Sequence, residues 1–120
     1  MESMTSQITT VQGIKARSRE LTIITASSSF EARDRVITLA SSGLERDVQH
    51  AAVHRFQGFA FATGGYDHVW YVPHHLICGF NGNGPLCTAA ALAALGFGNE
   101  SQIGSEITVG GNTARFHYTK

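Results

Sequence analysis

A glycine- and asparagine-rich segment that leads directly into an alanine-rich one constrains the fold of this chain most. Gly79–Gly84 reads GFNGNG, Pro85 follows, and residues 86–95 hold five alanines in LCTAAALAAL. Proline fits the first position of a helix, alanine has the highest helix propensity, and Gly96 is a typical stop. The pattern predicts a loop, then Pro85 where the first helical residue would be, and then an alanine-rich helix over Leu86–Leu95. Because its side chains are small, this helix must pack closely, on its own sheet or on a second copy.

The remainder of the chain predicts a small α+β domain. Ser28 and Glu31 match the S-x-x-E capping box, which indicates a helix that ends near Gly43. Residues 44–56 fit helix or strand, and a short helical turn followed by a strand from about Ala52 is favoured. Further strands are predicted from β-branched and aromatic residues and from turn glycines. They are Ile8–Val11, Glu20–Ala26, a hairpin over Phe56–Val72, Leu76–Cys78, and a second hairpin of Glu106–Val109 with Thr113–Thr119.

This pattern predicts one ligand-binding domain over residues 1–120, with residues 1–6 flexible. It comprises a small antiparallel sheet and two helices, one of which is opened by the glycine-rich loop.

The charge balance disfavours one large class of partners. Nine basic residues cancel nine acidic ones, whereas proteins that bind long nucleic acids carry a basic surplus. Charged residues make up only 15% of the chain, against roughly 25% in an average domain. Because a small domain has much surface to cover, this shortage indicates a homo-oligomer, a dimer or larger. The alternative is a monomer with a surface rich in Ser, Thr and Gly.

No membrane or export signal is visible. The most apolar stretch, around Ile77–Leu95, is interrupted by NGNGP, and the N-terminal residues MESMTSQITT lack a basic start and an apolar run. We expect a soluble cytoplasmic protein, in the host cytosol if the chain is phage-encoded.

The glycine-rich loop has the properties of an anion seat. A helix start offers unpaired backbone N–H groups and partial positive charge, and glycines let a ligand approach closely. Phe80 offers a flat face to a base, Asn81 and Asn83 add amide groups, and Thr88 lies one turn into the helix. The loop matches neither nucleotide fingerprint G-x-x-x-x-G-K-[ST] nor G-x-G-x-x-G. A tight connection without a ligand is the alternative.

The segment CGFNGNGPLCTAAALAAL, with Arg55 before it and a basic, aromatic C-terminal strand, resembles small phage anti-Thoeris proteins, which sequester cyclic ADP-ribose-type signals. The resemblance implies a non-enzymatic nucleotide sponge that counters a host immune signal. It implies a homo-oligomer built from dimers, with cyclic oligonucleotides held at a second site. By position, Phe80 would stack on adenine and Arg55 and Arg115 would pair with phosphates, while Thr88 and the glycine loop would serve the second site.

The residue chemistry fits such a ligand independently. Seven of the nine basic residues are arginines, whose forked guanidinium pairs with phosphate oxygens, although a single arginine often only covers surface. The predicted binding residues are Arg55, Phe80, Asn81, Gly82, Asn83, Gly84, Thr88 and Arg115.

Two other functions remain open. One is a phage inhibitor that binds proteins, similar to anti-CRISPR proteins, through an exposed aromatic patch. The other is a papain-like cysteine enzyme, with Cys87 activated at a helix start and His117 as its base. His74, His75, Cys78 and Cys87 are residue types that bind zinc, but their spacing matches no common site, so we expect no metal and no cofactor.

Overall fold

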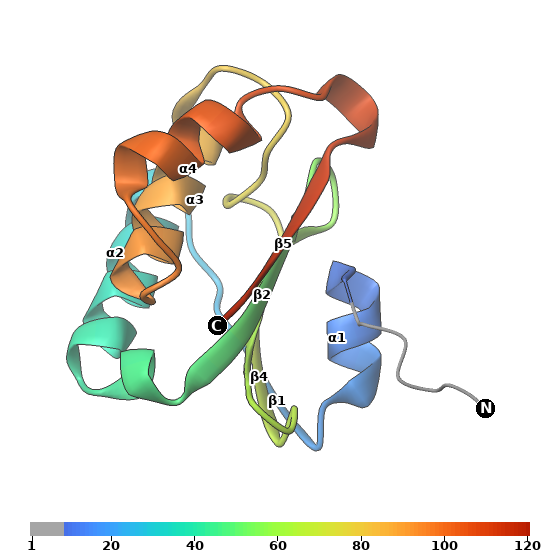
Figure 1. Cartoon of the computed structure of the whole chain (residues 1–120), viewed down its shortest axis with the longest axis vertical. Helices are drawn as coiled ribbons and strands as arrows, with labels where there is room; N and C mark the ends of the chain where they lie inside the picture. Colours follow the sequence, from blue (N-terminus) through green and yellow to red (C-terminus); the bar gives the residue numbers. More distant parts are fainter. Residues whose placement is uncertain (1–8) are drawn as a thin grey trace.

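The computed structural model describes residues 9–120, in which helices cover both faces of a five-stranded sheet (Figure 1). The strand order is β1-β4-β3-β2-β5; β1 runs parallel to β4, and the other neighbours are antiparallel. The α+β class is confirmed, but the sheet is mixed and larger than the predicted antiparallel one. The strands are β1 (Glu20–Ile23), β2 (Val48–His54), β3 (Gly58–Thr63), β4 (His68–Val72) and β5 (Arg115–Thr119).

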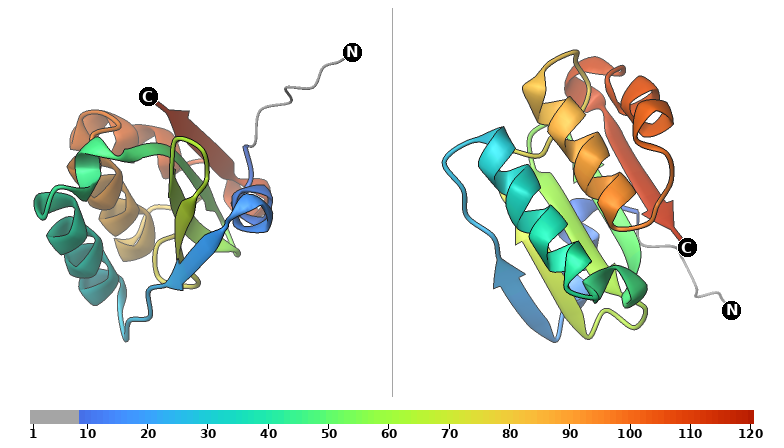
Figure 2. Two further views of the ribbon diagram at one scale, coloured as in Figure 1. Left: turned by 90° about the horizontal axis from the view of Figure 1, so that it is seen from below. Right: turned by 90° about the vertical axis from the view of Figure 1, so that its left-hand side faces the viewer.

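The described residues form four α-helices rather than the predicted two. The helices are α1 (Val11–Arg17), α2 (Ser29–Ser41), α3 (Asn83–Ala94) and α4 (Glu100–Ile107), with short 3-10 turns at Leu44–Arg46 and Gly111–Thr113. Helices α2, α3 and α4 lie on one face of the sheet and α1 lies on the other (Figures 1 and 2). Strand β3 shows why both faces are covered. Phe59 and Phe61 pack beneath the three helices, whereas Ala60 and Ala62 pack against α1.

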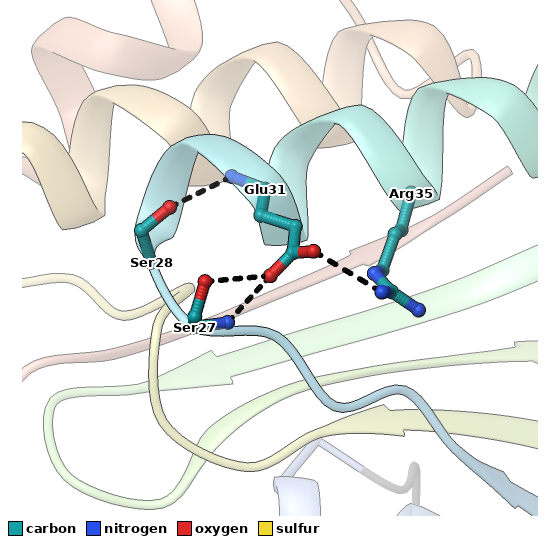
Figure 3. Close-up of polar contacts among 4 residues, drawn as sticks. All are labelled: Ser27, Ser28, Glu31 and Arg35. Carbon is teal, nitrogen blue, oxygen red and sulfur yellow. Dashed lines mark hydrogen bonds and ion pairs between the residues drawn. The ribbon is translucent and has the colours of Figure 1, made fainter.

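The start of α2 follows from its capping residues, as the sequence predicts. The Ser28 hydroxyl accepts a hydrogen bond from the Glu31 N–H at 3.1 Å. The Glu31 carboxylate accepts from the N–H and the hydroxyl of Ser27, not from Ser28, and pairs with Arg35 one turn later (Figure 3). These bonds satisfy donors that a helix start leaves free.

The N-terminal strand predictions are wrong in part. Ile8 lies outside the described residues, and Val11 begins α1, where the Thr10 hydroxyl accepts from the Gly13 N–H at 2.9 Å. Strand β1 ends at Ile23 rather than Ala26, and β2 begins at Val48 rather than near Ala52. The expected flexibility of residues 1–6 also falls outside the described range. In contrast, the hairpin of β3 and β4 is confirmed.

The predicted second hairpin is also wrong. Residues 106 and 107 belong to α4, which begins where the Asn99 side chain accepts from the Gln102 N–H and which buries Ile103 and Ile107. The predicted strand over Thr113–Thr119 is present as β5, from Arg115 to Thr119, but it pairs with β2 instead.

Two predictions around α3 need correction. Leu76–Cys78 is a buried connection rather than a strand, since its two end residues pack into the core beneath the helices. Helix α3 begins at Asn83, so Pro85 is its third residue. Within residues 9–120, no helix combines the length and apolar character needed to cross a bilayer.

Candidate functional site

Three segments that are distant in sequence meet at one end of the sheet. We call this region the loop junction; it comprises residues 55–57, 78–83 and 110–114 (Figure 1, top). Backbone hydrogen bonds join the segments: the Arg55 N–H donates to the Ala114 carbonyl at 3.0 Å, and the Gly111 N–H donates to the Gly79 carbonyl at 2.9 Å. The Gly79 N–H donates to the carbonyl of Ile107, the last residue of α4, at 2.7 Å. The junction is therefore held by the main chain of β2, α4 and the approach to β5.

Arg55 is the charged residue at the centre of the loop junction. It follows β2 directly, and its guanidinium carbon lies 4.2 Å from the centroid of the Phe80 ring and 5.4 Å from that of Phe56. The side chain is half-buried, and its Nη1 atom is buried with no hydrogen-bond partner within the described protein. A buried guanidinium nitrogen normally has an acceptor. The junction thus contains one buried guanidinium nitrogen that no acceptor of the described protein reaches.

The loop glycines mainly allow close packing, which differs from the predicted open seat. Gly79 has φ +96°, and a Cβ there would lie 2.5 Å from the Gly111 carbonyl oxygen. A Cβ on Gly84 would lie 2.9 Å from the Ile77 side chain. These glycines let the chain approach its own neighbours.

The Phe80 ring packs against Gly82, the residue that precedes α3. A Cβ on Gly82 would lie 2.6 Å from that ring, so Phe80 lies between Arg55 and the residue that precedes the helix. No side chain caps α3, and the N–H groups of Asn83 and Gly84 have no preceding carbonyl within the helix to bond. Asn81 and Asn83 are exposed beside this opening. Pro85, at the third position, contributes no N–H.

Two of the predicted binding residues lie apart from this group. Thr88 is fully buried, and its hydroxyl lies 2.9 Å from the carbonyls of Ile77 and Gly84, so it fastens the loop to α3. Arg115 is exposed and lines a small hollow beside α1 with Thr10. Since Arg55 packs against the loop on the helix-covered side, the two arginines do not converge.

The structure also separates the two residues of the cysteine-enzyme hypothesis. Cys87 is buried in α3, whereas His117 faces the α1 side of the sheet beside Ala52. Burial raises the pKa of Cys87 and raises that of Cys78 to about 12, which disfavours the reactive thiolate at neutral pH. Among residues 9–120, no three His, Cys, Asp or Glu side chains are grouped closely enough to hold a metal ion.

Sequence reasoning missed two features because both depend on strand pairing. The first is Arg55 at the end of β2, whose guanidinium lies beside the Phe56 ring and has one nitrogen without a partner. The second is a cluster on β1 and β4, in which the Thr22 hydroxyl lies 2.7 Å from Nε2 of His68 and the His68 ring stacks on Trp70 at 3.9 Å. The parallel register places Thr22 opposite Trp70, and this cluster fastens β1 to the sheet.

Comparison with known proteins found no relative of this chain. No family model, no curated protein and no solved structure matches the chain. Its function is therefore inferred from the geometry of the loop junction.

Proposed function

We propose that the protein sequesters a small phosphate-bearing nucleotide at the loop junction and leaves it chemically unchanged. The observation that supports this most is the buried Nη1 atom of Arg55, which lacks a partner and belongs to a guanidinium stacked on Phe80. An unpaired buried donor costs about 1–3 kcal/mol, and more when it is charged. A phosphate oxygen supplies the missing acceptor and neutralises the charge at once.

The surrounding groups fit the other parts of a nucleotide. Phe56 and Phe80 supply aromatic rings at the junction, against which a base can stack. The first N–H groups of α3, at Asn83 and Gly84, directly follow Gly82, which lies against the Phe80 ring, and a helix start suits a second anionic oxygen. In this proposal the Arg55 guanidinium separates from the Phe80 ring when the ligand binds. The phosphate then pairs with the guanidinium, and the base stacks on the ring.

The state of the two cysteine thiols supports binding of the ligand without its chemical conversion. The two cysteines considered as nucleophiles are buried and have raised pKa values. A cyclic ADP-ribose isomer or a cyclic oligonucleotide, acting as a host immune signal, carries the phosphate, base and ribose groups that the junction suits. The resemblance of the loop and helix to anti-Thoeris proteins favours the same ligand class.

Calorimetric titration with cyclic ADP-ribose isomers, cyclic dinucleotides and inorganic pyrophosphate tests this function. Loss of a charged, forked hydrogen bond costs about 1.5–3 kcal/mol, so Arg55→Gln should weaken binding roughly 10- to 100-fold. Arg115→Gln is the matched control and should bind as the wild type does, because Arg115 faces the α1 side. Bound ligand recovered by chromatography should be intact. Absence of heat with every compound, or unaltered binding by Arg55→Gln, refutes the proposal.

A second candidate, a protein-binding inhibitor, is favoured by one observation. A groove of about 540 Å³ runs between α3 and α4, and its lining includes Leu86 and Val109, which are 50% and 60% exposed. In an assay of immune suppression, Leu86→Lys should abolish suppression if the groove binds a protein. Arg55→Gln should abolish it if the junction binds a nucleotide.

A further inference from the structure

Strand β1 is the free edge of the sheet on the side opposite β5. Among the described strands it pairs only with β4, and Figure 2 shows it at the margin, beyond α2. The Glu20 N–H donates to the Asp67 carbonyl at 3.0 Å and the Ile24 N–H donates to the Tyr71 carbonyl at 2.8 Å. In a strand, the N–H and C=O of one residue point to the same side and alternate along the chain. The main-chain groups of Leu21 and Ile23 therefore point outward, away from the sheet.

This free edge carries apolar side chains at its centre. Leu21 is 40% exposed and Ile23 is 54% exposed. Proteins normally protect such an edge with charge, since an open strand with apolar side chains recruits another strand. Both edges carry charge at an end, Glu20 on β1 and Arg115 on β5, but no large hydrophobic side chain of β5 is exposed. The exposed apolar centre of β1 therefore indicates an edge that another strand can cover.

We propose that β1 pairs antiparallel with β1 of a second copy of this chain, about a two-fold axis that passes through Thr22. In this register Leu21 lies opposite the partner's Ile23, and the two residues exchange both of their outward hydrogen bonds. Their side chains meet on the face that carries α1, because Leu21 and Ile23 stand beside Val69 and Tyr71. The two five-stranded sheets become one continuous sheet.

The neighbourhood of β1 favours a second copy over a partner of one dominant charge. A cleft of about 580 Å³ separates β1 from α2, and its α2 wall carries Glu31, Asp34 and Arg35. These charges are already paired within the chain, Glu31 with Arg35 at 3.1 Å and Asp34 with Arg33 at 2.9 Å, so an identical wall can lie against this one without net repulsion. A strongly basic or acidic partner would find no unpaired charge of the opposite sign on it.

The size of a stable interface supports the same arrangement. Stable interfaces cover about 800 Å² on each partner, which is more than a four-residue strand supplies alone. When the strands pair, the two clefts face each other across the axis and add the α2 surfaces to the contact. Such burial also accounts for a chain with only 15% charged residues.

The strand is already held in the shape that pairing requires. The hydrogen bond between Thr22 and His68, together with the parallel ladder to β4, fixes β1 in its extended form. A second copy therefore meets an ordered edge, which lowers the entropic cost of association. The loop junction lies at the ends of β2 and β5, which β3 and β4 separate from β1. Dimer variants should therefore leave nucleotide binding unchanged, so the two proposals fail independently.

Sedimentation equilibrium of the full chain tests this interface. The wild type should have at least twice the chain mass of 12.9 kDa, and Ile23→Lys should halve the wild-type mass. Ile23→Pro should do the same, because it removes an outward N–H that β4 does not use. Val109→Lys is the matched control, an equally exposed apolar residue on the far side, and should keep the wild-type mass.

Circular dichroism should show the wild-type spectrum for Ile23→Lys, since the side chain is exposed in the monomer, and its melting temperature should not depend on protein concentration. A wild type that stays at 12.9 kDa overturns the proposal, and so do lysine and proline variants that both retain the wild-type mass. Dissociation of Val109→Lys in place of Ile23→Lys assigns the interface to the α3–α4 groove and refutes the β1 pairing.

Discussion

Replacing Arg55 with methionine should make the protein more stable and less able to bind. The change removes the buried Nη1 atom that has no partner and keeps most of the side-chain volume. One unpaired buried donor costs about 1–3 kcal/mol, while the stacking on Phe80 that is lost contributes about 0.5–1 kcal/mol. The balance is a gain of about 1 kcal/mol in the free energy of unfolding.

This gain corresponds to a measurable shift in melting temperature. At about 2.1 cal/mol/K for each of 120 residues, the unfolding entropy is about 250 cal/mol/K, so about 1 kcal/mol raises Tm by about 4 °C. Differential scanning calorimetry without ligand measures the shift. A ligand at one hundred times its Kd should stabilise the wild type by about 2.7 kcal/mol and should stabilise Arg55→Met far less.

Arg115→Met provides the control for this stability argument. Because Arg115 is exposed, its replacement should change the unfolding free energy by no more than about 0.5 kcal/mol. A clear loss of stability in Arg55→Met would show that the guanidinium is satisfied in the free protein. The reasoning that a missing acceptor marks a binding site would then be wrong.

Backbone strain, titration and thiol burial give three further predictions. Gly58→Ala should lower the free energy of unfolding in urea by about 3 kcal/mol, since Gly58 has φ +93° and a Cβ would lie 2.3 Å from the Val72 carbonyl oxygen of β4. Gly64→Ala is the control and should leave the free energy of unfolding nearly unchanged. Hydrogen bonds from the preceding turn and an ion pair lower the pKa of Glu31 from 4.5 to about 2. Its stabilising effect is complete above pH 4.5 and is lost as the pH falls toward 2, so acid titration should find the gap between wild type and Glu31→Gln closing there. Cys78 and Cys87 should resist iodoacetamide in the native protein at pH 8, as mass spectrometry would show, and rapid labelling of either would contradict their burial.

The sequence predicts an element well where one physical signal dominates. Ser28 and Glu31 locate α2, and the alanine run locates α3, because capping and propensity agree at both places. Signals conflict in α1 and α4. Ile103 and Ile107 have helical spacing, but β-branched residues around 107–109 favour a strand, and packing against α3 decides for helix.

The candidate site could be located from sequence but not described from it. The loop beside α3 is where the prediction placed it, yet its glycines serve contacts within the protein, and the unsatisfied charge comes from Arg55 at the end of β2. That placement depends on β5 pairing with β2, which brings Ala114 onto the main chain of Arg55 and so sets the arginine beside Phe80. Composition and spacing do not encode strand order. A residue whose chemistry depends on which strands are neighbours therefore becomes visible only in the folded chain, as the unpaired nitrogen of Arg55 does here.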